Sequence, residues 1–238
     1  MSVIVTMAGA GSRFQQAGYR VPKYMIEARG QTLFDWAIQS LQAFHEQHFV
    51  FACLQEHDAD WIRARAHRAG LRRVDIMARA ALSLGQAHTA IDVIAAVDPH
   101  EPVWIYNIDT YIERGLHPHD LRGHQGCLHV FESQSPAMSY VRFDAQDQVC
   151  EIVEKVVISS WATVGMYGFE TAQLFAQLYQ TSYGQPQTPQ ASEQYIAPIY
   201  QSLLRQGGRV CAPRLASSAV HILGTPQEVR LFDPDVHP

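Results

Sequence analysis

The chain opens on a short apolar run that is followed at once by a loop of small residues. Residues 2–7 (SVIVTM) have the pattern of a buried β-strand, and the loop after them consists of Ala8, Gly9, Ala10, Gly11 and Ser12. In open α/β sheets, ligands bind beyond the carboxyl ends of the strands, where small residues let backbone N–H groups approach phosphate oxygens closely. This order of strand and loop therefore predicts an α/β sheet with a phosphate-binding turn after its first strand.

Two common phosphate-binding motifs are excluded by the residues around this loop. Phe14 stands where the dinucleotide fingerprint has its third glycine, and no Gly-Lys-Ser/Thr of a Walker A loop follows. A glycine-rich turn that only reverses the chain remains the structural alternative, and the loop alone does not decide between the two.

Strand and helix patterns alternate through the first half of the chain. After residues 2–7, the expected strands are 49–54, 74–77 and 102–108, and the expected helices are 33–44, 58–69 and 83–96. Thr32 with Asp35 resembles an N-terminal capping arrangement, and Asp58 is an acidic cap. Such alternation is typical of a mainly parallel sheet with helices on both faces.

The second half begins with closely spaced strand candidates at 126–132, 139–143 and 149–153, which indicate a mixed sheet edge. A strand at 162–169, helices at 171–180 and 192–206, and late strands at 210–213 and 219–223 follow. Residues 184–192 (GQPQTPQAS) are an expected exposed loop, and Thr225-Pro226 is a candidate cap for a last helix. We expect one domain, residues 1–238, with a three-layer, Rossmann-like α/β fold whose mixed sheet is mainly parallel.

Composition narrows the classes of partner. The 238 residues include 18 Lys plus Arg against 23 Asp plus Glu, which gives a formal charge of −5 and no basic field for nucleic acid. No apolar run is long enough to span a bilayer, and no basic segment precedes the first one. The four cysteines are scattered, which fits a reducing cytoplasm. We expect neither a nucleic-acid nor a membrane partner, and self-association stays open.

Residues 7–38, MAGAGSRF followed by PKYMIEARGQTLFDWAI, resemble a family signature. The family is that of nucleotidyltransferases, which includes sugar-phosphate nucleotidylyltransferases and related cytidylyltransferases on a GT-A-like Rossmann sheet. The resemblance implies that Arg13 holds the leaving pyrophosphate and that Lys23 holds the α-phosphate and the incoming phosphate. Nucleotidyl transfer brings several negative charges together, so fixed cations suit it. The structural alternative for each side chain, taken singly, is an ordinary solvated cation on the surface.

Two further segments match the nucleotide half of the family, residues 1–122. Gly85 and Gln86 fall in the base-binding segment, where a glutamine amide can both donate to and accept from a base. Asn107 and Asp109 follow a buried strand, and the resemblance assigns Mg²⁺ to Asp109. An exposed glutamine at a helix start and a turn aspartate are the structural alternatives.

The acceptor half, residues 123–238, matches less completely. The resemblance places Glu154, Lys155, Gly165, Tyr167 and Glu193, with Tyr195 nearby, around the acceptor. An ordinary exposed ion pair is the alternative for Glu154 and Lys155.

The late ILGTP segment departs from the family pattern. Ile222 stands where sugar-nucleotide members carry a second metal-binding aspartate. The adjacent His221 faces the other way in a strand, so we expect it not to substitute. The metal is then expected to rest on Asp109, phosphates and water.

The predicted reaction is attack by a phosphate monoester, a sugar 1-phosphate or another small phosphorylated compound, on the α-phosphorus of a nucleoside triphosphate. Pyrophosphate leaves, and Mg²⁺ is the expected cofactor. CTP, UTP and dTTP stay open, and surface-polysaccharide synthesis is the expected role by family habit. A GT-A glycosyltransferase and a catalytically silent nucleotide- or sugar-binding protein are the alternatives.

Overall fold

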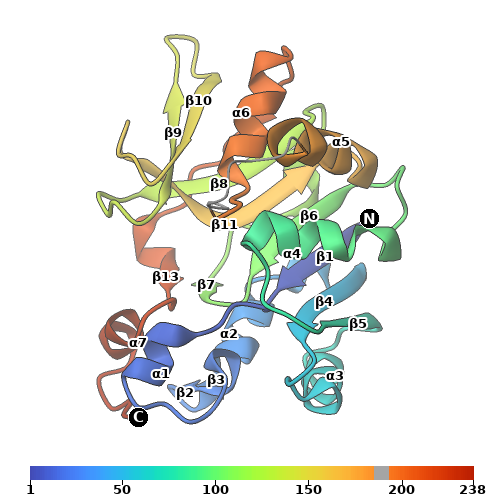
Figure 1. Ribbon diagram of the computed structural model, residues 1–238. Helices are drawn as coiled ribbons and strands as arrows, with labels where there is room; N and C mark the ends of the chain where they lie inside the picture. Colours follow the sequence, from blue (N-terminus) through green and yellow to red (C-terminus); the bar gives the residue numbers. More distant parts are fainter. Residues whose placement is uncertain (185–192) are drawn as a thin grey trace.

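The computed structural model describes residues 1–184 and 193–238, and a mixed central sheet runs through it (Figure 1). Within these residues the sheet has nine strands. Seven lie in the order β10 (Val149–Glu154), β9 (Ser139–Phe143), β11 (Trp161–Phe169), β6 (Val103–Asn107), β1 (Ser2–Thr6), β4 (His48–Leu54) and β5 (Arg73–Arg79). Beside β11 lies β8 (Gly126–Glu132), which also pairs with β12 (Val210–Cys211).

The first strand is the centre of the parallel part of the sheet. β1 pairs in parallel with β4 on one side and with β6 on the other, and β4 pairs in parallel with β5. β11 then runs antiparallel to β6, and β8, β9 and β10 extend the sheet with further antiparallel pairs. The predicted mixed α/β sheet is confirmed, with its antiparallel strands in the second half of the chain.

Helices cover both faces of this sheet because its central strands are apolar on both sides. Val3 and Val5 of β1 pack with α2 (Leu33–Gln39) and α3 (Ala59–Arg68), whereas Ile4 packs toward α4 (Gln86–Asp92), α5 (Ala172–Tyr183) and α6 (Ala197–Arg205). Alternate side chains of one buried strand thus serve two cores. The three-layer architecture predicted from the sequence is confirmed.

A third, smaller core joins the two ends of the chain. It packs α1 (Ser12–Gln16) and the hairpin of β2 (Glu27–Ala28) and β3 (Gln31–Thr32) against α7 (Pro226–Phe232), as Figure 1 shows at its lower left. β13 (Val220–Ile222) pairs with β7 (Thr110–Ile112) just before α7. Near its end the chain therefore returns to β7, the short strand that follows β6.

Several expected boundaries are corrected by the structure. The helix expected at 83–96 begins at Gln86, because Gly85 has a φ of 140° and interrupts the helical backbone. The helix expected at 33–44 ends at Gln39, and a separate 3₁₀ turn covers Gln42–Phe44.

The helix expected at 192–206 begins only at Ala197, because the residues before it form backbone hydrogen bonds with the segment around Gly85. Residues 185–192, most of the predicted exposed loop, lie outside the described part of the chain. Among the helices of residues 1–184 and 193–238, none has the length and apolar character needed to cross a bilayer.

Candidate active site

A cleft of about 940 Å³ opens at the carboxyl ends of β1, β4 and β6. After β1 the chain first adds β4 and β5 on one side of this strand and then β6 on the other. Open α/β sheets bind ligands at the point where the strand order reverses in this way. Of the site residues predicted from the sequence, all but Gly11 and Ser12 line the cleft. Residues from both halves of the chain therefore face one continuous space.

The glycine-rich turn forms one wall of this cleft. Gly11 is the N-cap of α1 with a φ of 61°, so its role is conformational. Gly9 is exposed, and a Cβ added there would have no atom of the described chain within 4 Å. Its small size is therefore required neither by the backbone nor by packing, and it leaves space for a ligand. Arg13 is exposed on α1 and lines the same wall.

Lys23 and Asp109 form an ion pair at the floor of the cleft. Lys23 Nζ donates to Asp109 Oδ2 over 2.7 Å, and the two side chains are 23% and 22% exposed. Burial raises the pKa of Asp109, but the Lys23 ammonium and hydrogen bonds from Lys23, the backbone and Asn107 outweigh it and hold that pKa below its usual value. The two residues assigned separate roles from the sequence thus neutralise each other.

Gln86 and Asn107 meet beside this pair. Gln86 Nε2 donates to Asn107 Oδ1 over 2.6 Å and lies 3.4 Å from Thr6 Oγ1. Gly165 makes room for this arrangement, because a Cβ there would lie 2.2 Å from Asn107 Nδ2, and its φ is 83°. The absence of a side chain at Gly165 is therefore required by the Asn107 amide.

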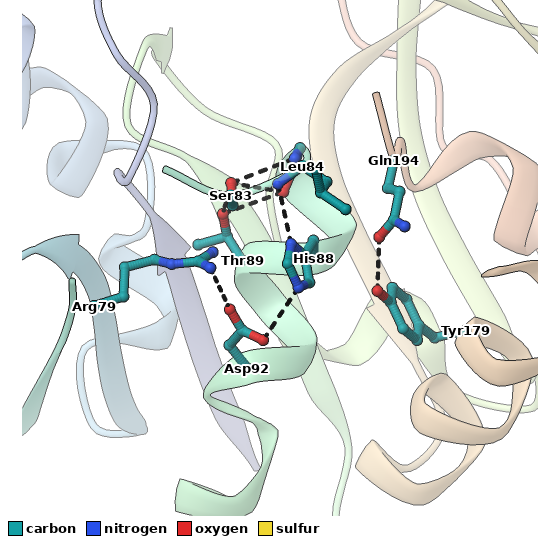
Figure 2. Close-up of polar contacts among 9 residues, drawn as sticks. Arg79, Ser83, Leu84, His88, Thr89, Asp92, Tyr179 and Gln194 are labelled. Atoms are coloured by element: carbon teal, nitrogen blue, oxygen red, sulfur yellow. Dashed lines mark hydrogen bonds and ion pairs between the residues drawn. The ribbon is translucent and has the colours of Figure 1, made fainter. Parts of the chain in front are cut away.

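A polar network of side chains stabilises the segment before α4 (Figure 2). Leu84 N–H donates to His88 Nδ1 over 3.0 Å, and His88 Nε2 lies 3.5 Å from Asp92 Oδ1. Arg79 pairs with the same carboxylate at 2.8 Å. This network fixes the backbone on which Gly85 and Gln86 are carried.

The same segment is tied to the second half of the chain. Gln194 N–H donates to Leu84 O over 2.7 Å, and Ala87 N–H donates to Gln194 O over 3.0 Å. Gly85 permits this contact, because a Cβ there would lie 2.5 Å from Gln194 O. Tyr179 OH donates to Gln194 Oε1 over 2.6 Å, as Figure 2 shows. Gln194 therefore fixes the segment from Leu84 to Ala87 against the residues that precede α6.

At the far end of the cleft, Lys155 lies among Tyr195, Glu193 and Glu154. Lys155 Nζ donates to Tyr195 OH, and Tyr195 OH donates to Glu193. The Lys155 backbone has a left-handed φ of 56°, and its N–H donates to Met138 O over 3.0 Å. The hydrogen bond to Tyr195 is the main reason that the pKa of Lys155 is raised. Strained backbone of this kind clusters at functional sites.

A half-buried carboxyl group and a buried tyrosine lie near this cation. Glu154 accepts a hydrogen bond from Ser139 Oγ, but burial dominates and raises the pKa of Glu154. Tyr167 OH lies 3.0 Å from Thr163 Oγ1, and burial together with the Glu154 charge raises the pKa of Tyr167 to about 12. Tyr167 therefore stays protonated and supports this end of the cleft from within the sheet.

The segment that departs from the family pattern lies next to Asp109. Ile222 lines the cleft, whereas His221 points away, with Nε2 3.1 Å from Glu113 Oε1 and its ring stacked on Tyr111. Strand alternation predicts this orientation. Within residues 1–184 and 193–238, no three His, Cys, Asp or Glu side chains are grouped to hold a metal ion.

Comparisons with known proteins place the chain in a family. No family model matches the sequence, and neither does any curated protein. Among solved structures, a nucleoside-diphosphate-sugar pyrophosphorylase from Vibrio cholerae RC9 is 30% identical and superposes with a TM-score of 0.89 over 98% of this chain and 99% of that one. The chain belongs to the sugar-phosphate nucleotidylyltransferase family.

More distant structures share the nucleotidylyltransferase fold. The inositol-1-phosphate CTP transferase from T. maritima is 16% identical, with a TM-score of 0.75 over 97% of this chain and 94% of its own. A putative glucose-1-phosphate thymidylyltransferase from Bacillus anthracis is also 16% identical, with a TM-score of 0.77 over 100% and 97%. The predicted family, fold and enzyme class are confirmed, which decides against the glycosyltransferase alternative.

Several residues of this nucleotidylyltransferase site were not predicted. Thr6, Ser139 and His88 are single polar residues at strand ends or in a helix, and no local pattern distinguishes them from surface residues. Glu228, in the first turn of α7, is not among the residues that line the cleft, and its spacing of three residues from Thr225 predicts only a part in helix capping.

Proposed function

We propose that this nucleotidylyltransferase transfers a nucleotidyl group from a nucleoside triphosphate to a phosphate monoester and releases pyrophosphate. The acceptor we propose is a sugar 1-phosphate or a similarly small phosphorylated compound. The observation that carries the proposal is one cleft that is lined by the glycine-rich turn, by Arg13 and Lys23 and also by Lys155. The names of the relatives support it, since they act on nucleoside-diphosphate sugars, inositol 1-phosphate or glucose 1-phosphate.

The reaction we propose is a single in-line displacement. An acceptor phosphate oxygen forms a bond to the α-phosphorus, the bond from the α-phosphorus to the bridging oxygen of the β-phosphate breaks, and the electron pair leaves with pyrophosphate. In this proposal Lys23 holds the α-phosphate and the incoming phosphate, and Arg13 holds the leaving pyrophosphate. Catalysis of this kind is mostly positioning and charge neutralisation, so no side-chain nucleophile is required.

We propose Mg²⁺ as the cofactor, held by Asp109. The residues present fit a divalent cation, because carboxylate oxygens suit it and Gly224 leaves a gap beside Asp109 that a Cβ would fill, 3.3 Å from Oδ2. When bound there, Mg²⁺ would neutralise charge on the phosphate oxygens. Lys23 is the residue that must then exchange its bond to Asp109 for one to phosphate.

We propose that the opposite end of the cleft binds the acceptor. Lys155 is held as a cation by Tyr195 and Glu193, which suits a phosphate, and Glu154 can accept hydrogen bonds from hydroxyl groups. The hydrogen bonds between Leu84, Ala87 and Gln194 would then link base binding to acceptor binding.

We further propose a role in making activated sugars for surface polysaccharides. The support is the family, whose Vibrio cholerae member is a nucleoside-diphosphate-sugar pyrophosphorylase. The four cysteines, all in the described residues, are free, which favours a cytoplasmic location where nucleoside triphosphates are available.

A pyrophosphate-release screen tests the proposed reaction. UTP, CTP, dTTP and ATP are each combined with a panel of sugar 1-phosphates, inositol 1-phosphate and small alcohol phosphates, with and without Mg²⁺. We expect release only with a pyrimidine nucleotide, an acceptor and the metal together. Tight binding of triphosphates without release for any pair would instead support the catalytically silent alternative.

A further inference from the structure

The site lacks a carboxylate at the position where the family pattern has one. Ile222 lines the cleft beside Asp109, and an aliphatic side chain cannot bind a cation. Mg²⁺ is commonly held by one or two carboxylates together with substrate phosphates and water. A second carboxylate from elsewhere in the chain would give the cation two carboxylate ligands again. The inference that follows rests on the proposed function.

Glu228 is a carboxylate close to this gap, and its bonding differs from that of other capping residues. Thr225 caps α7 by accepting from Glu228 N–H over 3.2 Å, but the Glu228 carboxylate does not return a bond to the cap. In α2, by contrast, Asp35 Oδ2 accepts from Thr32 N–H over 3.0 Å and completes the box. Glu228 Oε2 is buried and has no hydrogen-bond partner in the described chain.

Gly224 shows where this carboxylate points. A Cβ built on Gly224 would lie 3.3 Å from Asp109 Oδ2 and 3.5 Å from Glu228 Oε2, so both oxygens border one gap. Backbone hydrogen bonds fix the position of the gap, since β13 pairs with β7 and Leu223 N–H donates to Asp109 O over 2.8 Å. Side chains from two distant parts of the sequence therefore converge there.

We propose that Glu228 supplies the second carboxylate for the divalent cation, in place of the aspartate that Ile222 replaces. A buried carboxylate oxygen without a partner is costly, and a cation between it and Asp109 removes that cost and the repulsion between the two charges. The absent side chain at Gly224 leaves the space. The ligand reaches the site from the first turn of α7 rather than from β13, six residues along the chain from the usual position.

Binding of Mn²⁺, followed by the loss of the free-ion electron paramagnetic resonance signal, tests this proposal without turnover. The variants are Glu228→Gln, Glu228→Asp and Gly224→Ala, with Asp109→Asn as the reference for a lost ligand. Glu113→Gln is the matched control, because it removes a nearby carboxylate, directly after strand β7, that contacts His221 instead of the gap. Each protein is titrated alone and with UTP, CTP or dTTP, the acceptor being omitted.

We expect Glu228→Gln and Gly224→Ala to weaken Mn²⁺ binding by about tenfold or more, and Glu113→Gln to bind as the unaltered protein does. Glu228→Asp separates a ligand from a cap. Aspartate already closes the capping box in α2, so a capping role would be kept and the unfolding temperature maintained, while the shorter side chain would lose the metal.

Unchanged Mn²⁺ affinity in Glu228→Gln, with only a lower unfolding temperature, would overturn the proposal and leave Glu228 with a structural role in the first turn of α7. Failure of the proposed function would look different. In that case no pair of triphosphate and acceptor would release pyrophosphate, whether or not a triphosphate binds, yet the titration with Mn²⁺ alone would still compare Glu228→Gln with Glu113→Gln.

Discussion

At the scale of single residues, the decisive feature is the contact between Lys23 and Asp109. Each side chain is about four-fifths buried, and neither would be stable there as an unpaired charge. Their ion pair keeps the two groups ordered where the phosphates are proposed to bind. A substitution at one of them therefore changes the electrostatics of the other, and activity alone does not separate the two roles.

Replacing Lys23 by alanine is expected to lower the rate of pyrophosphate release by about a hundredfold, or about 2.7 kcal/mol of barrier, because charge on the transferred phosphate is then poorly neutralised. The measurement is the rate at saturating substrates. Arg68→Ala is the control, since Arg68 is an exposed cation on α3 away from the cleft. A loss of less than about tenfold, or changed nucleotide affinity alone, would contradict the assignment.

Glu154 gives a prediction about pH. Its pKa is raised, chiefly by burial, so the ionised form is disfavoured in the folded protein. That unfavourable effect is absent below the usual glutamate pKa and develops fully as pH rises through the raised value. Glu154→Gln should therefore raise the unfolding temperature at neutral pH, and the difference should disappear in acid.

Thermal unfolding from acid to neutral pH checks this, with Glu151→Gln as the control. Glu151 is on the same strand but pairs with Arg142 at the surface, so its replacement should change little at any pH. A neutral-pH loss of stability in Glu154→Gln would show that Lys155 stabilises the carboxylate more than burial destabilises it.

At the scale of elements, local chemistry explains what the sequence could predict. β1 is recognisable as an apolar strand, α3 from its Asp58 cap, and α7 from Thr225 with Pro226, because each signal lies within a few residues. The late start of α6 was not predictable in this way. The residues before it are extended because Gln194 pairs with Leu84 and Ala87, more than a hundred residues earlier.

Gly85 is the residue on which this contact between distant segments depends. Gly85→Ala would place a Cβ 2.5 Å from Gln194 O at a φ of 140°, and we expect a loss of about 1–3 kcal/mol in the free energy of unfolding. Because the contact joins the proposed base and acceptor segments, KM should rise for both substrates.

Gly207→Ala provides the comparison, since Gly207 also has a positive φ, 77°, but a Cβ there meets nothing in the described chain within 4 Å. It should cost stability without changing either KM. If Gly85→Ala raises KM for the nucleotide alone, the two segments are not coupled through Gln194.

At the scale of the whole molecule, the sequence predicted which residues face the cleft better than it predicted their contacts. The glycine-rich turn, Lys23 and Asp109 belong to contiguous motifs, and the parallel sheet brings such motifs to one edge. The ion pair between Lys23 and Asp109 and the approach of Asp109 to Gly224 and Glu228 depend instead on tertiary packing between segments that are far apart in the sequence. No periodicity or spacing records that packing.

The charge of the whole cleft leads to a last prediction, about removal of the metal. The protein has a formal charge of −5, and the cleft is lined by equal numbers of basic and acidic side chains, Arg13, Arg20, Lys23 and Lys155 against Glu56, Asp109, Glu154 and Glu193. A metal-free triphosphate therefore meets no net positive field, and its affinity should fall by about tenfold or more when Mg²⁺ is chelated. Titration calorimetry of the active triphosphate with and without Mg²⁺ measures this, and the matching nucleoside monophosphate, which carries less charge, should depend on the metal far less. Equal affinity of the triphosphate under both conditions would mean that Arg13 and Lys23 bind the phosphates without a metal ion. The carboxylates beside them would then not bind Mg²⁺ together with the triphosphate.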